Sequence, residues 1–166
     1  MEGTFIQMKV TGLTIDPFTS MPIIILRDME DKAALPIWIG LIEASSIATE
    51  LEHIQLSRPM THDLLKQLLD QFHITVDKVA VTELRDNTFY SKVYLKKDDQ
   101  IVELDSRPSD AIAIALRTQA PIFVEKSVVD KSRKIDLGST DEEQKKRKWA
   151  EILESLSPED FGKYKM

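Results

Sequence analysis

The order of hydrophobic and polar positions predicts the same series of elements twice, three strands followed by a helix. In the first half, alternation over Phe5–Ile15 predicts a strand that ends at the turn Asp16-Pro17. The almost continuous apolar run Pro22–Leu26 is typical of a strand buried on both faces. A third strand over Leu35–Ile39 and a helix over Leu41–Leu51 follow. The second half predicts strands over Val76–Leu84, Thr88–Leu95 and Ile101–Leu104, a helix over Ser109–Thr118, and a last strand over Ile122–Val129.

A separate amphipathic helix is predicted between the two halves, over Thr61–Phe72. Its leucines and Phe72 recur at i, i+1, i+4, i+5 and i+8, which places them on one stripe of a helix. Thr61 is the expected N-cap here, and Ser109 is the expected N-cap of the later helix. The residues expected in the core are Ile24, Ile37, Leu65, Leu68, Val93 and Ile114.

Short sequence matches support a duplication. Val10-Thr11-Gly12-Leu13 returns as Val81-Thr82-Glu83-Leu84, and Glu43-Ala44 returns, in the same order, as Asp110-Ala111. Ordered matches at similar separation indicate a repeated supersecondary unit. We therefore predict an α+β fold in which duplicated β-β-β-α units form one mixed or antiparallel sheet, or a barrel-like core, with flanking helices. The two halves are expected to superpose, with Glu43 and Asp110 at equivalent positions near the starts of their helices.

Size and composition narrow the class of protein. The 166 residues, 42% of them hydrophobic, correspond to one ordinary domain, which we place at residues 1–130, with a linker and charged helical tail at 131–166. No cysteine occurs, which excludes disulfides, thiolate metal sites and cysteine nucleophiles. The apolar runs are too short to span a bilayer, and no signal peptide is recognisable at the start. We expect a soluble, cytoplasmic protein with no membrane partner.

The net charge of −6 argues against a protein that binds nucleic acid passively through a broad basic face. The only basic cluster, Lys145-Lys146-Arg147-Lys148, lies beside acidic residues and is typical of a solvated helix face. Any contact with nucleic acid should therefore be local.

Two Arg-Pro steps could form such a local site. Pro59 and Pro108 keep Arg58 and Arg107 extended at the start of a predicted helix, where a guanidinium and helix N–H groups together suit a phosphate. Ser109 is a further candidate for substrate binding. Four carboxylates supply the oxygen ligands that Mg²⁺ or Mn²⁺ accepts, and the candidate metal ligands are Glu43, Asp63, Asp105 and Asp110. From residue types alone, a purely structural ion-pair network is the more common reading.

His62 is the remaining candidate, as a neutral imidazole in the first turn of a helix that could act as a base, or as a packing residue. His53 and His73 are assigned to structure, Asp16 and Asp86 to turns, and Trp38 to the core. No Gly-rich phosphate loop, Gly-x-Ser-x-Gly elbow or His-Glu-x-x-His motif is present.

Several of these segments resemble, in order, the signature blocks of the bifunctional nuclease domain family over about residues 8–129. The segments are Asp16-Pro17, Pro22–Asp28, Leu35–Gly40 with Glu43-Ala44, Arg58–Leu65, Asp86–Tyr90 and Asp105–Ala113. The resemblance implies an α+β fold with internal duplication, oligomers, and activity on DNA and RNA. Thr140–Leu156 lacks the Leu-Arg-Asp-like segment of the repair-protein motif that bacterial members often carry.

Two functions are therefore expected as alternatives. The first is a metal-dependent nuclease that hydrolyses DNA and RNA, with His62, Asp63, Arg58 and Arg107 as catalytic residues and no organic cofactor. The second is a non-catalytic oligomeric module that recognises an anionic ligand. Both readings predict a homo-oligomer, at least a dimer, because an open sheet has exposed edge strands.

Overall fold

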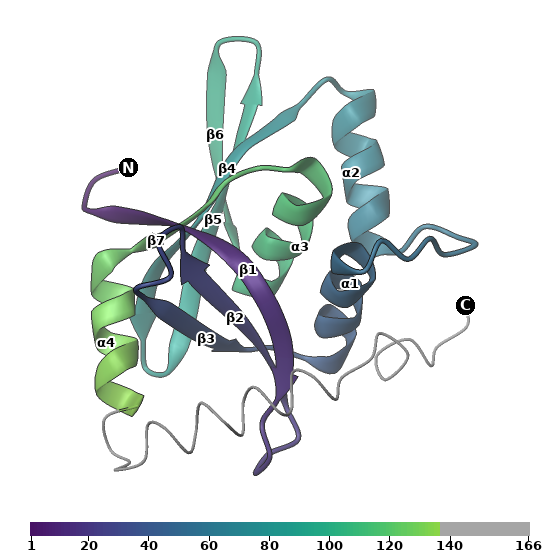
Figure 1. Ribbon diagram of the computed structural model, residues 1–166. Helices are drawn as coiled ribbons and strands as arrows, with labels where there is room; N and C mark the ends of the chain where they lie inside the picture. The colour runs from purple at the N-terminus through teal and green to yellow at the C-terminus, as the bar shows by residue number, and fades with distance from the viewer. Residues whose placement is uncertain (137–166) are drawn as a thin grey trace.

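The computed structural model describes residues 1–136, which form one mixed seven-stranded sheet and four helices (Figure 1). The strands are β1 (Phe5–Ile15), β2 (Pro22–Asp28), β3 (Ala34–Trp38), β4 (Thr75–Arg85), β5 (Thr88–Lys97), β6 (Gln100–Ser106) and β7 (Ile122–Glu125). The helices are α1 (Leu41–Leu51), α2 (Thr61–Gln71), α3 (Pro108–Thr118) and α4 (Lys126–Asp136). The charged tail predicted by the sequence lies outside the described residues.

The sheet is open, with the strand order β3-β2-β1-β7-β4-β5-β6. All pairings are antiparallel except the parallel pair of β4 and β7. The sheet alternative of the predicted fold is therefore correct, and the barrel-like alternative is wrong. Strands β3 and β6 are left as edges. No helix in residues 1–136 has both the length and the apolar character required to cross a bilayer.

The strand β7 lies between two antiparallel three-stranded ribbons, β1-β2-β3 and β4-β5-β6, each followed later in the chain by a helix. Glu43 is the third residue of α1, and Asp110 is the third residue of α3. This common order is what a duplication predicts, and the duplication itself stays a prediction.

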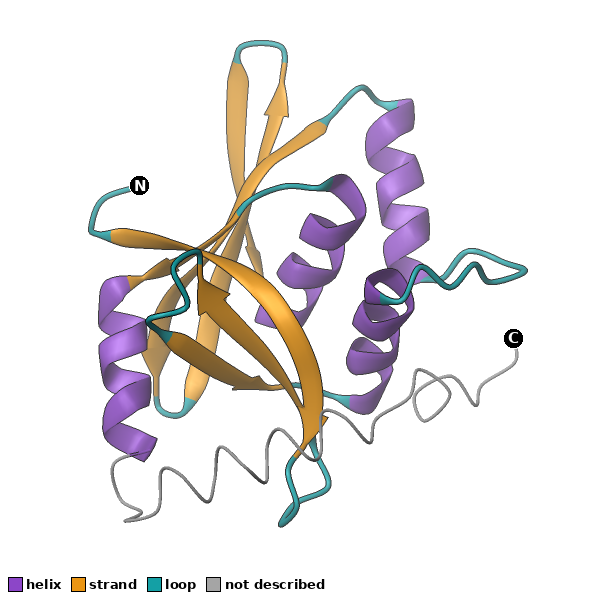
Figure 2. Ribbon diagram, in the orientation of Figure 1, coloured by secondary structure: helices purple, strands orange, loops and turns teal. Residues whose placement is uncertain are grey.

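Helices α1, α2 and α3 gather on one side of the sheet, and α4 lies on the other (Figure 2). Helix α3 is central, because it contacts α1, α2, β4 and β5. The small side chains Ala44, Ala48, Ala111 and Ala115 are all buried, which lets α1 and α3 approach closely. The starts of three helices are thereby brought together, and most of the predicted site residues lie there.

Four of the six predicted core residues are buried, namely Ile24, Ile37, Val93 and Ile114. The prediction is wrong for Leu65 and Leu68, which are 38% and 53% exposed. Helix α2 contacts α3 through the flank that carries His62 and Leu69, so most of its apolar stripe faces solvent. Hydrophobic periodicity identified the helix but not the face that packs.

Three further predictions need correction. Trp38 is 42% exposed at the edge strand β3, where its Nε1 donates to Asp16 Oδ2 at 3.0 Å, so it is not a core residue. The last strand ends at Glu125 instead of Val129, because Val128 and Val129 are buried on the first turns of α4. The N-caps are Met60 and Arg107, one and two residues before the expected Thr61 and Ser109.

Candidate functional site

An ion-pair network joins the starts of α1 and α3. Arg107 donates from Nε to Asp110 Oδ2 at 2.8 Å and from Nη2 to Asp110 Oδ1 at 3.1 Å, a bidentate pair. Its Nη1 donates to Glu43 Oε1 at 2.7 Å. The Arg107 side chain is 63% exposed, whereas Glu43 and Asp110 are 20% and 34% exposed. Arg107 therefore lies as an exposed cation over two partly covered carboxylates.

Proline and glycine set this geometry. Pro108 occupies the first helical position of α3, and Arg107 before it has the extended backbone that a following proline favours. Gly40 precedes α1, and an added Cβ there would collide with the Glu43 carboxylate. The absence of a side chain at Gly40 thus leaves room for Glu43 to fold back at the helix start and reach Arg107.

His62 connects the same network to the interior. Its Nε2 lies 2.9 Å from Asp110 Oδ1, and its Nδ1 lies 2.7 Å from Ser46 Oγ. A carboxylate only accepts, so Nε2 carries the proton toward Asp110, and Nδ1 of the neutral ring accepts from the Ser46 hydroxyl. His62 is 9% exposed and Ser46 is 1% exposed. Both ring nitrogens are engaged, and the hydroxyl is too buried to attack a substrate.

A second network, centred on Arg117, lies beside the first. The Arg117 side chain is only 3% exposed, and its Nε donates to Asp63 Oδ1 at 2.7 Å. Its two terminal nitrogens donate to the carbonyl oxygens of Ala113 and Ser46, at 3.2 and 3.1 Å. Asp63 Oδ2 also accepts from the backbone N–H of Met60 at 2.9 Å. Arg117 thus ties α3 to both α1 and α2.

Asp110 and Asp63 are held ionised by their hydrogen-bond partners. Burial raises the pKa of Asp110, but hydrogen bonds from Arg107 and His62 outweigh it, so the pKa lies below its usual range. Burial likewise raises the pKa of Asp63, and the hydrogen bonds from Arg117 and Met60 lower it below the usual range. The pKa of Arg107 is raised by its hydrogen bonds to Asp110 and Glu43.

These shifts predict acid sensitivity. A carboxylate whose pKa is lower in the folded state contributes stability above its unfolded pKa, about 3.9 for Asp, and loses that contribution as the pH falls through the folded value. We expect a melting temperature that is level above about pH 5 and falls below about pH 4. The melting temperature of Asp63→Asn, expressed relative to its own value at pH 7, should fall less steeply over the acid range than that of the original protein. Parallel curves for the variant and the original protein would contradict this assignment.

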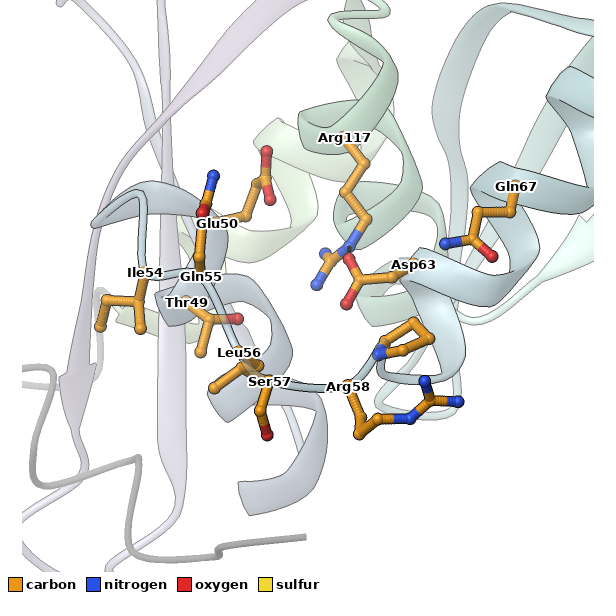
Figure 3. Close-up of a pocket in the computed structure, with 11 residues that line it drawn as sticks. Thr49, Glu50, Ile54, Gln55, Leu56, Ser57, Arg58, Asp63, Gln67 and Arg117 are labelled. Atoms are coloured by element: carbon orange, nitrogen blue, oxygen red, sulfur yellow. Dashed lines mark hydrogen bonds and ion pairs between the residues drawn. The ribbon is translucent and has the colours of Figure 1, made fainter.

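Arg58 lies at an open cavity of about 360 Å³ next to the Arg117 network (Figure 3). The cavity is formed by the end of α1, the loop that follows it, the first turns of α2 and the buried Arg117. The residues that line it are Thr49, Glu50, Ile54, Gln55, Leu56, Ser57, Arg58, Pro59, Asp63, Gln67 and Arg117. Arg107 and Asp110 do not line this cavity, so the two arginines of the Arg-Pro steps do not share one cleft.

The predicted metal ligands do not converge on one point. Asp105 is exposed on β6, opposite Lys92 of β5. Asp63 pairs with Arg117, and the guanidinium of Arg107 lies where a cation would bridge Glu43 and Asp110. Within residues 1–136, no three His, Asp or Glu side chains are arranged to hold a metal ion. As arranged, these residues do not fit a divalent cation.

Ser109, the further candidate for substrate binding, is 6% exposed and is not at the surface.

Sequence reasoning did not identify Ser46 and Arg117, two residues that organise the site. Ser46 lies three residues after Glu43 in a run of small residues that reads as packing. Arg117 follows the apolar stretch 111–116, and a single arginine at the end of a helix ordinarily indicates a solvated C-terminus. The useful signal was its spacing of seven residues from Asp110, which places both residues on nearly the same face of α3.

Comparison with known proteins identifies the family. The sequence model of the bifunctional nuclease domain family matches residues 24–136, which include every site residue described above. An uncharacterized protein of Mycobacterium tuberculosis is 33% identical over 162 residues, covering 93% of this chain and 97% of that protein. Bifunctional nuclease 1 of Oryza sativa subsp. japonica is 33% identical over 109 residues, covering 63% of this chain and 33% of that protein. Bifunctional nuclease 1 of Arabidopsis thaliana is 32% identical over 120 residues, covering 69% of this chain and 37% of that protein. This chain thus spans about a third of the length of these plant relatives. The chain belongs to the bifunctional nuclease domain family.

Proposed function

We propose that this protein hydrolyses phosphodiester bonds of DNA and RNA at the surface formed by Glu43, His62, Arg107 and Asp110. The observation that carries the proposal is the geometry of Arg107. Three of the five guanidinium N–H groups donate to Asp110 and Glu43, so two remain for a substrate. A cation that is exposed and already fixed in orientation is suited to bind a phosphate, because it loses little conformational entropy on binding.

The other residues position this clamp. Asp110 orients both Arg107 and the His62 ring, and Ser46 fixes the far side of that ring. To activate water, His62 would release Asp110 and take the other tautomer, in which Nδ1 donates to Ser46 Oγ and the unprotonated Nε2, on the less buried side of the ring, accepts a proton from water. In this proposal His62 is the base, Arg107 the phosphate clamp, and Arg58 and Asp63 belong to the neighbouring binding surface.

A divalent cation requirement is a separate prediction of the nuclease proposal, with Glu43, Asp63, Asp105 and Asp110 as its candidate ligands. The described arrangement would need Arg107 to leave the two carboxylates before a cation could approach them. We therefore assign no step to a metal. Activity measured with Mg²⁺, with Mn²⁺ and with EDTA tests the requirement. A cytoplasmic location also stays a prediction.

The alternative function, an anion-binding module without catalysis, is favoured by one observation. Both nitrogens of His62 and both oxygens of Asp110 already have partners, which is the pattern of a satisfied structural network. In that case the same Arg107 would bind a phosphate but no bond would be broken. Binding without hydrolysis distinguishes this reading from the nuclease proposal.

Arg107→Ala is expected to weaken binding of single-stranded nucleic acid about tenfold, because one charge-assisted contact to phosphate is lost. Its effect on the free energy of unfolding should stay below about 1 kcal/mol, since the Arg107 side chain is 63% exposed and its ion pairs are screened by water. Fluorescence anisotropy and thermal melting of the one variant measure both effects. A large thermal loss with unchanged affinity would show that Arg107 is structural and would end the active-site proposal.

We also propose that the protein is a homodimer in which a second copy covers the apolar face of α2. Leu64, Leu65, Leu68 and Phe72 are 60%, 38%, 53% and 57% exposed on this face. The edge strand β6 exposes Ile101, Val102 and Leu104 in addition. If one contact covered both elements, these side chains would bury on the order of 700 Å² per copy, near the ~800 Å² of a standard interface.

Leu68→Glu should convert such a dimer into monomers, because the substitution places a charge in the centre of the apolar face. Light scattering is expected to return about twice the chain mass of 19.0 kDa for the original protein and a single mass for the variant. Phe18→Glu is the matched control, since Phe18 is 93% exposed on the loop between β1 and β2. A monomer for the original protein at micromolar concentration would contradict the proposal.

A further inference from the structure

The cavity beside the Arg117 network has the composition of a binding site for a neutral, hydrogen-bonding group. Its charged lining residues are two arginines and two carboxylates, so the charges of Arg58, Arg117, Glu50 and Asp63 cancel. A free anion would meet Glu50 inside the cavity. In contrast, a ligand that both donates and accepts hydrogen bonds would find partners of both kinds.

Arg117 supplies donors that the protein does not use. Its guanidinium has five N–H groups, and the described hydrogen bonds engage three of them, with Asp63, Ala113 and Ser46. The side chain is 3% exposed, and its terminal nitrogens point into the space between α1 and α2 (Figure 3). Unused donors on a guanidinium this buried are costly unless a ligand or water accepts from them. Because Arg117 lines the cavity, an acceptor bound there is within reach of this guanidinium.

Amides and apolar groups complete the lining. Gln67 extends from α2 toward the pair of Arg117 and Asp63, and Gln55 lies across the cavity on the loop after α1 (Figure 3). Ile54, Leu56 and Pro59 provide apolar surface beside them. An unstacked nucleobase is recognised by amides that hydrogen-bond to its edge and by apolar groups that pack on its flat face. A cavity of 360 Å³ has room for one base with its sugar.

We propose that this cavity holds one nucleobase of a single-stranded substrate, with Arg58 at the mouth on the adjacent phosphate. The proposal rests on the proposed nuclease function and adds a base subsite to the phosphate clamp at Arg107. Pairing inside a duplex hides the base edges, so the subsite selects unpaired strands. Gln67 and Gln55 are specificity-determining residues, because they contact the base and not the reacting phosphate.

The test compares binding of two fluorescent hexamers that carry the same phosphates, one of deoxyadenosine and one of abasic deoxyribose. We expect the original protein to bind the base-containing hexamer about tenfold more tightly, in the range for one recognised base. Gln67→Leu should reduce this ratio to about threefold or less and leave the abasic affinity unchanged. Gln7→Leu, an exposed position on β1, is the matched control. Arg58→Ala should weaken both hexamers by the same factor, because it acts on phosphate.

Three outcomes would overturn the proposal, and they differ in what they say of the nuclease function. Equal binding of both hexamers by the original protein would mean that only phosphate is recognised, and the nuclease proposal would stand. A base preference that survives in Gln67→Leu would place the base elsewhere on the protein. Failure to bind either hexamer would remove the nuclease proposal together with the subsite.

Discussion

Replacing Arg117 by Met is expected to lower the free energy of unfolding by about 3 kcal/mol, the largest stability effect that we predict for a single substitution. The change removes one donor from Asp63 Oδ1 and one from each carbonyl oxygen of Ser46 and Ala113, at a side chain that is only 3% exposed. Asp63 is 34% exposed and can be partly rehydrated, which keeps the estimate at the lower end of the range for a broken buried pair.

Arg27→Ala is the control for this experiment, because Arg27 is exposed on β2 and its loss should cost less than about 0.5 kcal/mol. Urea unfolding at pH 7 measures both variants. A loss below about 1 kcal/mol for Arg117→Met would mean that water replaces the guanidinium without penalty. The role of Arg117 in joining the three helices would then be wrong.

Asp110→Asn is expected to reduce hydrolysis of single-stranded DNA and RNA at least about 100-fold, the largest activity effect that we predict. The amide keeps the size of the side chain but removes the charge that orients both Arg107 and His62. Asp99→Asn is the matched control, since Asp99 is exposed in the turn between β5 and β6 and has no role in the proposal. Equal residual activity in Asp110→Asn and the original protein would indicate a contaminating nuclease.

The stability effect of Arg117→Met and the activity effect of Asp110→Asn distinguish the roles of the Arg117 network and the Arg107 network. Arg117 lies behind the surface and acts on stability, whereas Asp110 lies at the surface and acts on chemistry. Because Ser46 contributes its carbonyl oxygen to Arg117 and its hydroxyl to His62, the networks share one residue of α1. Substitutions at Ser46 should therefore affect both properties, and they do not isolate either role.

Local sequence signals predicted the features of the fold that depend on one residue type or on a short pattern, such as turns and the bounds of single elements. Asp16 was assigned to a turn, and its Oδ1 accepts from the N–H of Phe18 at 2.9 Å, an Asx turn. Alternation gave the bounds of β1, and Gly40 preceded a helix whose bounds were also predicted correctly. The Arg-Pro step placed Arg107 at the start of α3, where the structure has it.

Contacts between distant segments were not accessible from these signals. The stripe of α2 is amphipathic in sequence, but only tertiary packing decides that Leu69 is buried and Leu68 is exposed. Valines after β7 favour a strand by propensity, and their burial against the sheet makes them the first turns of α4 instead. The bond between Arg117 and Asp63 spans 54 residues, and that between His62 and Asp110 spans 48. Neither leaves a local pattern.

The most direct test of the nuclease proposal is hydrolysis of labelled single-stranded DNA and RNA by highly purified protein, measured beside Asp110→Asn purified in the same way. The reactions are run with Mg²⁺, with Mn²⁺ and with EDTA, so that the metal requirement is read from the same experiment. We predict cleavage of both substrates by the original protein and its loss in the variant. Tight binding of either substrate without any cleavage under all three conditions would contradict the nuclease proposal and establish the anion-binding module in its place.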